Sequence, residues 1–332
     1  MSEYVVCEFE EEMSGVWDRF IEQDSINGTF LQSRKFLSYH PKDRFRDFSL
    51  MIYDEKGHLV ALCPACLVKD EFGIEHFVAH KGSTFGGMII NKKNYSPQKI
   101  IAMLEVVENF LLKQKVHSIT YKITPDIFSK EKSDLLQYCL YYKEYTPIEE
   151  LSLYVDFQDY HENIYKNLSQ GKRTDVNNCI KEGMEYRTLS SDEEIEVFYS
   201  ILCSNLAKFD TTPVHSLGEL LEFKNKRLKE ICEFVGIYYQ DKMVAGGMLF
   251  HFSKQVVHTQ YLCALSDYNR LSPMSFLYYS ILDDMKKRGY RIVSWGTTTE
   301  DQGKYLNVGL AKSKEAYGSK YAVNWTYRKH LV

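Results

Sequence analysis

Tyr290–Tyr327 brings together side chains that can move a proton or hold a charge. An apolar run stops at Gly296, and a polar loop with three threonines and the acids Glu300 and Asp301 follows. A carboxylate beside a reacting amine can receive its proton, directly or through water. Acids in a loop are more often simply solvated. Glu300 and Asp301 are therefore candidate bases, with a solvated surface loop as the alternative.

A second candidate site lies where a long apolar segment begins, at Asn269–Pro273. Ser-Pro is a typical helix start, and the apolar spacing that follows predicts a helix over Ser272–Arg288. Free backbone N–H groups and the helix dipole favour an anion at such a start. We therefore expect Asn269, Arg270, Leu271 and Ser272 to bind a phosphate. The alternative is that Asn269 and Ser272 only cap the helix while Arg270 is solvated.

Three cations, Lys172, Arg173 and Lys181, recur on another predicted helix that ends at Gly183. Lys172 and Lys181 are nine residues apart, so one helix face need not hold all three. Two explanations are open: the cations lie on a solvated helix face, or they bind the negatively charged phosphates of a ligand.

Other reactive side chains give weaker signals. Cys63 and Cys66 have CxxC spacing but lie within a strand-like run, and no second Cys/His pair follows nearby, so no metal is predicted. Tyr261 and Tyr305 could protonate a leaving group. His251 and His258 could act as bases, or be half-buried strand residues. The loop Gly82–Gly87 is glycine-rich but lacks the Lys-Ser/Thr ending of a nucleotide-binding loop.

The bulk properties of the chain narrow its class. Its 332 residues suggest two domains, and its net charge of −4 excludes a global field that draws it onto nucleic acid or an anionic membrane. The eight dispersed cysteines and the absence of a signal peptide indicate a cytoplasmic protein with reduced thiols. No apolar run is long enough to span a membrane. The sequence gives no usable signal on oligomeric state.

Predicted strands and helices alternate along the chain and recur in similar order in two halves. A helix is predicted over Ser96–Gln114, a strand over His58–Val68, a helix over Ile127–Gln137 and a strand over Leu140–Tyr145. A long helix followed by a strand closes each half. These patterns predict an α/β fold with mixed α+β sheets, in two domains at 1–150 and 151–332.

The last part of the chain resembles the Fem-like branch of the GNAT acyltransferase superfamily. The similarity rests on Leu265–Pro273, Gly289-Tyr290, Trp295-Gly296 and the segment Leu306–Gly318. Upstream, Gly171–Gly183 is similar to the Lys/Arg-rich helix of that branch, and Gly28–Ser33 to its N-terminal loop and strand. The resemblance spans nearly the whole chain and implies two GNAT-like domains in tandem, with the acyl-transfer site in the C-terminal one.

The resemblance also implies roles for particular residues. Lys314 would face the acyl-transfer region, to stabilise an oxyanion or hold the acceptor. The acceptor cleft would contain Lys172, Arg173 and Lys181, and substrate binding would include Gln32 and Trp295. The phosphate expected near Arg270 would belong to the donor, acetyl-coenzyme A or a related acyl-coenzyme A.

The function implied is transfer of an acyl group, most simply acetyl, to an amine of a cell-envelope precursor such as a nucleotide- or lipid-linked amino sugar. Two alternatives stay open. One is aminoacyl-tRNA-dependent formation of peptidoglycan bridges, which the lack of a coiled-coil arm and the net charge of −4 disfavour. The other is a cleft-binding protein without turnover, because the turn Asp267–Ser272 has no glycine where related enzymes bind the pyrophosphate of coenzyme A.

Overall fold

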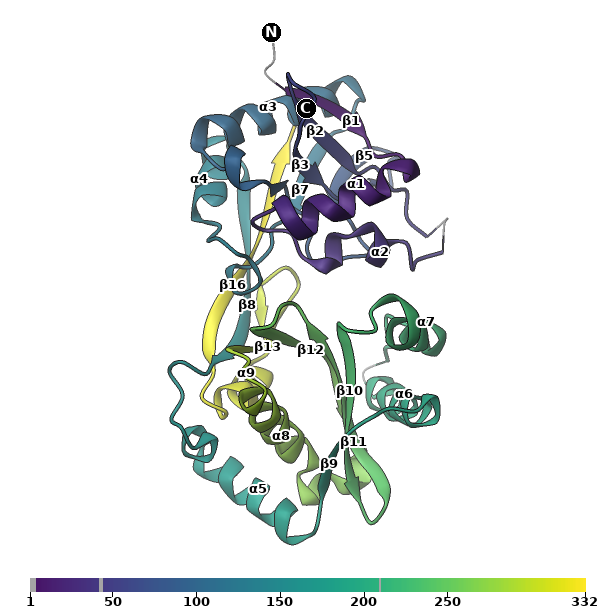
Figure 1. Ribbon diagram of the computed structural model, residues 1–332, viewed down its shortest axis with the longest axis vertical. Coiled ribbons are helices and arrows are strands. Elements are labelled where there is room, and N and C mark those ends of the chain that lie inside the picture. Colours follow the sequence, from purple (N-terminus) through teal and green to yellow (C-terminus); the bar gives the residue numbers. More distant parts are fainter. Residues whose placement is uncertain (1–3, 42–43, 209) are drawn as a thin grey trace. The chain divides into compact units, whose positions relative to one another are not determined.

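The computed structural model describes residues 4–41, 44–208 and 210–332 (Figure 1). The chain forms two compact units, one of Met1–Glu150 with Val323–Val332 and the other of Leu151–Ala322. The sequence-based division assigned 151–332 to one domain. The structure differs at the C-terminus, because the last strand pairs within the N-terminal unit.

The N-terminal unit contains two groups of paired strands. The first has the order β1-β2-β3-β6 and is antiparallel, and the second joins β4, β5, β7 and the end of β16, with β5 and β7 parallel. The strands are β1 (Tyr4–Glu8), β2 (Leu50–Asp54), β3 (Leu59–Cys63), β4 (Ala65–Lys69), β5 (Glu75–Ala79), β6 (Ile89–Ile90), β7 (Ser118–Lys122) and β16 (Lys320–His330).

Helices of the N-terminal unit cover both faces of its strands. Along β2, Leu50 and Ile52 belong to the core packed against α3, whereas Met51 joins Trp17 of α1 in a smaller cluster. Alternation along a strand explains this split, because successive side chains point to opposite faces. The helices are α1 (Ser14–Arg19), α2 (Arg34–Leu37), α3 (Pro97–Lys113) and α4 (Asp134–Tyr142).

Some sequence-based elements of this unit are confirmed and others are wrong. The helix predicted over Ser96–Gln114 is α3. The strand predicted over His58–Val68 is two strands in different sheets, since Pro64 between them has no N–H to donate. The helix predicted over 127–137 and the strand predicted over 140–145 are also wrong, because one helix, α4, runs from 134 to 142 with its spaced apolar residues on the buried face.

The C-terminal unit is built on one sheet in the order β8-β13-β12-β11-β10-β9. Its strand pairs are antiparallel except for β12 with β13, which is parallel. The strands are β8 (Thr146–Asp156), β9 (Glu185–Thr188), β10 (Cys232–Tyr239), β11 (Lys242–His251), β12 (Val256–Ala264) and β13 (Ile292–Thr297), followed by a small hairpin of β14 (Thr299–Glu300) and β15 (Tyr305–Leu306).

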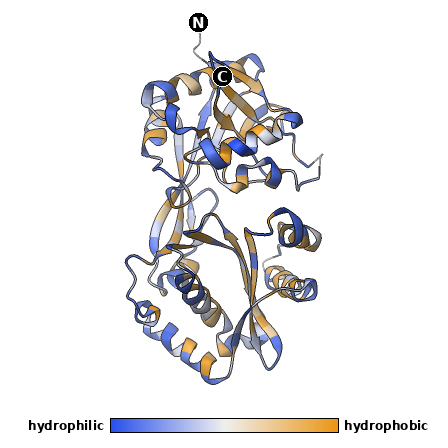
Figure 2. Cartoon of the chain, viewed as in Figure 1, coloured by the Kyte–Doolittle hydropathy of each residue, from blue (hydrophilic) through white to orange (hydrophobic). Residues whose placement is uncertain are grey.

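Two layers of helices enclose this sheet. In Figure 1, α5 and α8 lie on one face and α6 and α7 on the other, and Figure 2 shows hydrophobic residues concentrated on the strands between them. Leu277, Ile281 and Met285 of α8 are fully buried against the sheet. The helices are α5 (Gln170–Lys181), α6 (Asp192–Ala207), α7 (Leu217–Glu222), α8 (Pro273–Lys287) and α9 (Val308–Glu315).

The predicted α/β class with mixed sheets is confirmed. The helix predicted over Ser272–Arg288 is α8, and the Lys/Arg-rich helix is α5. The element that matters most for function is the parallel pair β12–β13, because each strand leads directly into one of the candidate sites.

Candidate active site

The parallel strands β12 and β13 pair over a short length and then part. Their register joins Val256 with Ile292 and ends where His258 pairs with Ser294. Both strands continue beyond this point, β12 to Ala264 and β13 to Thr297. Backbone N–H and C=O groups along these continuing edges need another partner. The sheet therefore has an opening between two of its central strands, with His258 at the closed end.

Gly296 makes the separation of the strands possible. It lies at an irregularity in the pairing of β13 with β8 and has a φ of 73°, a conformation that favours glycine. A Cβ atom at this position would lie 3.2 Å from Cε1 of His258. The glycine thus provides both the turn of the strand and the room for the imidazole.

Lys314 of α9 reaches the end of β13. Its side chain is buried, with 4% of the residue exposed, and Nζ donates hydrogen bonds to the carbonyl oxygens of Gly296 at 3.2 Å and Thr297 at 2.9 Å. Burial lowers the pKa of Lys314 to about 8. The amine is still mainly protonated at neutral pH. Since an ammonium has three N–H donors, one remains for a substrate atom.

His258 lies next to this ammonium and is neutral at physiological pH. Its Nδ1 is 3.1 Å from Oγ of Ser294. Burial, and secondly the charge of Lys314, lower the pKa of His258 to about 4. The closed end of the opening therefore combines a buried cation with an uncharged imidazole that can accept a proton.

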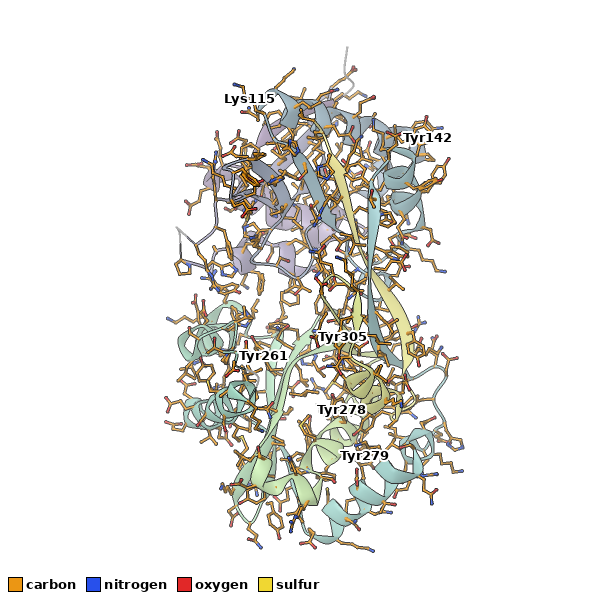
Figure 3. The ribbon with its side chains drawn as sticks, turned by 180° about the vertical axis from the view of Figure 1, so that it is seen from behind. Lys115, Tyr142, Tyr261, Tyr278, Tyr279 and Tyr305 are labelled. Carbon is orange, nitrogen blue, oxygen red and sulfur yellow. The ribbon has the colours of Figure 1, made fainter. Side chains whose placement is uncertain are left out.

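Tyr261 is further along β12, on the side of the sheet that faces α6 and α7 (Figure 3). Its hydroxyl is 2.7 Å from Nδ1 of the buried His215. Burial raises the pKa of Tyr261 to about 12, so the phenol keeps its proton at neutral pH and can donate it. Tyr305, the other tyrosine considered as an acid, is 59% exposed on the small hairpin.

The expected phosphate-binding turn connects β12 to α8. Residues Ser266–Leu271 form a 3-10 helix, and Ser272 follows with a φ of 57°. Ser272 makes no side-chain hydrogen bond to the start of α8, so this serine does not cap the helix in the usual way. Asn269 and Arg270 are exposed, and Leu271 is half-buried. The turn is thus open to a ligand, with the guanidinium at its surface.

The three cations of α5 have different surroundings. Lys172 donates to Oγ of Ser275 at 2.8 Å and lies 3.5 Å from Asp175. Arg173 is half-buried, and Lys181 is exposed in the last turn of the helix. Lys172 therefore reaches the first turn of α8 beside the open turn, whereas Lys181 points to solvent.

The acids of the threonine loop are not joined to Lys314. Glu300 and Asp301 are exposed at the tip of the β14–β15 hairpin, where Asp301 has a φ of 46°. Glu300 accepts a hydrogen bond from Asn307 at 3.2 Å. Within the residues that the structure describes, neither acid forms an ion pair or a hydrogen bond with Lys314. Their positions agree better with the solvated alternative than with a role as the base.

Two further residues lie in positions that do not suit substrate binding. Gln32 is completely buried, where its amide group bonds to Thr29 and Thr124. Trp295 is 4% exposed, and its indole N–H donates to Ser319 at 3.0 Å. Gln32 stabilises a turn of the N-terminal unit, and Trp295 forms part of the core under α8.

The CxxC pair does not provide reactive thiols. Burial raises the pKa of Cys63 to about 12 and that of Cys66 to about 11, so neither is a thiolate at neutral pH. Across the described ranges, no group of three or more His, Cys, Asp or Glu side chains could hold a metal ion.

Comparison with known proteins gives one family match, over part of the chain. Residues 173–305 match the model of the acetyltransferase (GNAT) domain. No curated protein matches the chain by sequence.

Solved structures share the fold over nearly the whole chain. FemX has a TM-score of 0.69 at 10% identity, with 98% of this chain and 96% of that chain covered. L-PGS from Bacillus licheniformis has a TM-score of 0.60 at 12% identity, covering 96% and 91%. A tandem GNAT protein from the clavulanic acid biosynthesis pathway has a TM-score of 0.57 at 9% identity, covering 99% of both.

Residues 173–305 thus match the GNAT acetyltransferase domain, and the whole chain shares the fold of FemX and of a tandem GNAT protein. The resemblance predicted from the sequence is confirmed, as is the arrangement of two GNAT-like domains in tandem. The chemistry of the class is acyl or aminoacyl transfer. In the described part of the chain, none of the helices has the length and apolar character needed to cross a membrane.

Proposed function

We propose that this protein transfers an acyl group, most simply acetyl, from an acyl-coenzyme A to an amine, with the site in Leu151–Ala322. The observation that carries the proposal is the opening between β12 and β13, which places Lys314 and His258 at its closed end within the segment that matches the GNAT acetyltransferase domain. An acceptor that fits the class is an amino sugar linked to a nucleotide or a lipid in cell-envelope synthesis.

The residues around the opening fit an acyl-coenzyme A. The unpaired edge of β12 offers backbone groups that can bond to the amides of an extended ligand arm, as a further strand would. Arg270 and the start of α8 suit the phosphates. The turn has no glycine, yet Ser272 adopts the positive φ of 57° for which glycine is usually required. The turn therefore forms without a glycine, so the absence of glycine no longer argues against coenzyme A binding.

Each of three side chains has a separate chemical task. Acyl-coenzyme A supplies a thioester carbonyl, and the ammonium of Lys314 stabilises the negative charge that develops on an oxygen beside it. Neutral His258 accepts the proton that the attacking nitrogen releases, directly or through a water. Tyr261 keeps its proton at neutral pH and can donate it to the leaving thiolate.

The acceptor is proposed to lie near Lys172 and Arg173 at the first turns of α5. Lys172 already bonds to Ser275, at the start of α8, so its charge is next to the turn that we assign to the donor. We assign the reaction to the cytoplasm, because the eight cysteines are free thiols in the structure and reduced thiols are typical of that compartment.

Calorimetric titration with coenzyme A tests the donor assignment. We expect saturable binding that Arg270→Ala weakens at least threefold, because a charge-assisted bond to phosphate is lost. Lys254→Ala removes another exposed cation of the same unit and should leave the affinity unchanged. Absence of coenzyme A binding together with binding of aminoacyl-tRNA would replace the proposal by aminoacyl transfer. Binding of a nucleotide-linked amino sugar with neither donor would indicate a protein without turnover.

Release of free thiol from acetyl-coenzyme A in the presence of nucleotide-linked amino sugars tests the catalytic assignment. His258→Gln should lower kcat by about 10²–10⁴-fold if His258 is the base. Coenzyme A affinity should be unchanged, because the imidazole is not assigned to donor binding. Glu300→Gln and Asp301→Asn are the matched comparisons. A large loss of kcat in either of these variants, with His258→Gln fully active, would instead identify Glu300 or Asp301 as the base.

A further inference from the structure

The open turn before α8 has a backbone conformation that serine rarely adopts. Ser272 has a φ of 57° and a ψ of 42°, in the left-handed region where a residue with a Cβ atom is crowded. Such a conformation persists only where the surrounding structure holds it. Among the described residues, the side chain of Ser272 does not cap the start of α8. Other contacts must therefore hold the turn in this form.

The thiol of Cys179 contacts the turn from the neighbouring helix, α5, which packs beside α8 (Figure 1). Its Sγ lies 3.0 Å from the carbonyl oxygen of Leu271 and 3.6 Å from that of Ser272. Cys179 is completely buried, and burial raises the pKa of its thiol to about 11. The thiol is therefore protonated at neutral pH and can donate to a carbonyl group.

The two carbonyl groups beside the thiol belong to the two peptide planes that flank the Cα atom of Ser272. The angle between these planes is set by φ and ψ of that residue. A hydrogen-bond donor that lies against both carbonyl groups therefore favours one pair of φ and ψ values over the others. Cys179 is thus placed to hold the left-handed conformation of Ser272.

A second contact joins the same face of α5 to the first turn of α8. Ser275 accepts a hydrogen bond from Nζ of Lys172 and donates one to Asp175, both at 2.8 Å. Lys172, Asp175 and Cys179 are spaced by three and four residues, so they lie on one side of the helix. This face of α5 therefore holds both the turn and the start of α8.

We propose that Cys179 is a positioning residue for the acyl donor: its thiol holds Ser272 in the left-handed conformation in which the turn receives the phosphates of acyl-coenzyme A. The proposal rests on the function proposed above and adds a residue that acts through the turn. Without the thiol, Ser272 relaxes toward negative φ, which rotates the peptide groups at the start of α8 away from a bound anion. After Ser272→Gly the thiol is no longer needed, because glycine adopts positive φ without support.

Calorimetric titration of the whole chain with coenzyme A compares Cys179→Ala in two backgrounds. In the wild-type background, loss of the thiol donor should weaken binding about three- to tenfold, the effect of one hydrogen bond. In the Ser272→Gly background, the same substitution should change the affinity by less than about twofold. A loss of the same size in both backgrounds, or no loss in the wild type, would overturn the proposal, because a general loss of packing does not depend on the residue at position 272.

Two further variants complete the comparison. Cys232→Ala removes another buried thiol of the same unit, in β10, and should leave the affinity unchanged. Cys179→Val fills the space of the sulfur but has no donor, so it should weaken binding as Cys179→Ala does. The valine variant takes the place of the alanine variant if that one does not fold. An equal loss in Cys232→Ala, or full affinity in Cys179→Val, would contradict the role of the thiol.

Steady-state kinetics separate positioning from catalysis. Cys179→Ala should raise the KM for acetyl-coenzyme A about three- to tenfold and leave kcat within about twofold, because the thiol acts on donor binding alone. A fall in kcat with an unchanged KM would overturn the assignment. A wild-type protein that binds no coenzyme A would refute the proposed function and this role with it. Wild-type binding that the Cys179 variants leave unchanged would refute only the role of Cys179.

Discussion

Replacing Lys314 by Met should raise the pKa of His258. The pKa of His258 is about 4, below the ordinary value of 6.5. Burial is the larger cause of this lowering and the charge of Lys314 the second. Removing that charge while keeping an unbranched side chain of similar length should therefore raise the pKa of His258 by about one unit, to a value still below 6.5.

This change is measurable without any substrate. With a pKa of about 4, about a tenth of His258 is protonated at pH 5, whereas with a pKa of about 5 about half of it is. Long-range ¹H–¹⁵N NMR spectra of the histidine rings report this fraction. The His258 signals can be assigned by their absence in His258→Gln.

Lys312→Met is the control for the pKa measurement, since Lys312 lies on the same helix, α9, but is exposed. It should leave the titration of His258 unchanged, because solvent screens a surface charge. If Lys314→Met and the control give the same pKa for His258, the ammonium and the imidazole do not interact as the structure indicates. The division of tasks proposed for the active site would then be wrong.

Two further predictions concern stability. Gly296→Ala should lower the free energy of unfolding in urea by about 2–3 kcal/mol, about 1 kcal/mol more than Gly289→Ala does. Both glycines have a positive φ, but only at Gly296 would a Cβ atom lie against His258. Equal losses in the two variants would refute the role of crowding. The free energy of unfolding should also fall by about 1–2 kcal/mol from pH 7 to pH 5, since the unfolded chain protonates His258 near 6.5 and the folded chain near 4. His258→Gln should lose about 1–2 kcal/mol less stability over this pH range than the wild type. The same pH dependence in the variant and the wild type would contradict the assignment of the decrease to His258.

Local patterns predicted the parts of the fold that depend on short-range interactions. The helix α8 and the turn before it follow from Ser-Pro and the apolar spacing, and both are present. The strand division at Pro64 was missed, although the missing N–H of proline is itself a local signal. The sequence could not show that the end of β16 belongs to the N-terminal unit, because its pairing with β7 joins strands about 200 residues apart.

The candidate site was predicted in part. Lys314 was chosen from the resemblance. The structure places its ammonium group in a buried position, bonded to the carbonyl oxygens of Gly296 and Thr297. The interaction of Lys314 with His258 joins a helix to a strand more than 50 residues earlier, so spacing alone could not reveal it. Glu300 and Asp301 had the right chemistry, but a hairpin of two-residue strands carries them to an exposed tip.

The buried position of Lys314 follows from the shape of the sheet. Where β13 leaves β12, the carbonyl groups of Gly296 and Thr297 accept hydrogen bonds from Nζ of Lys314. Buried carbonyl groups without a donor would be costly, so the lysine offsets part of the free energy lost by opening the sheet. The same contact holds a cation at the closed end of the opening and keeps the adjacent imidazole neutral. One side chain thus supplies hydrogen-bond donors at the opening of the sheet and a buried positive charge beside His258.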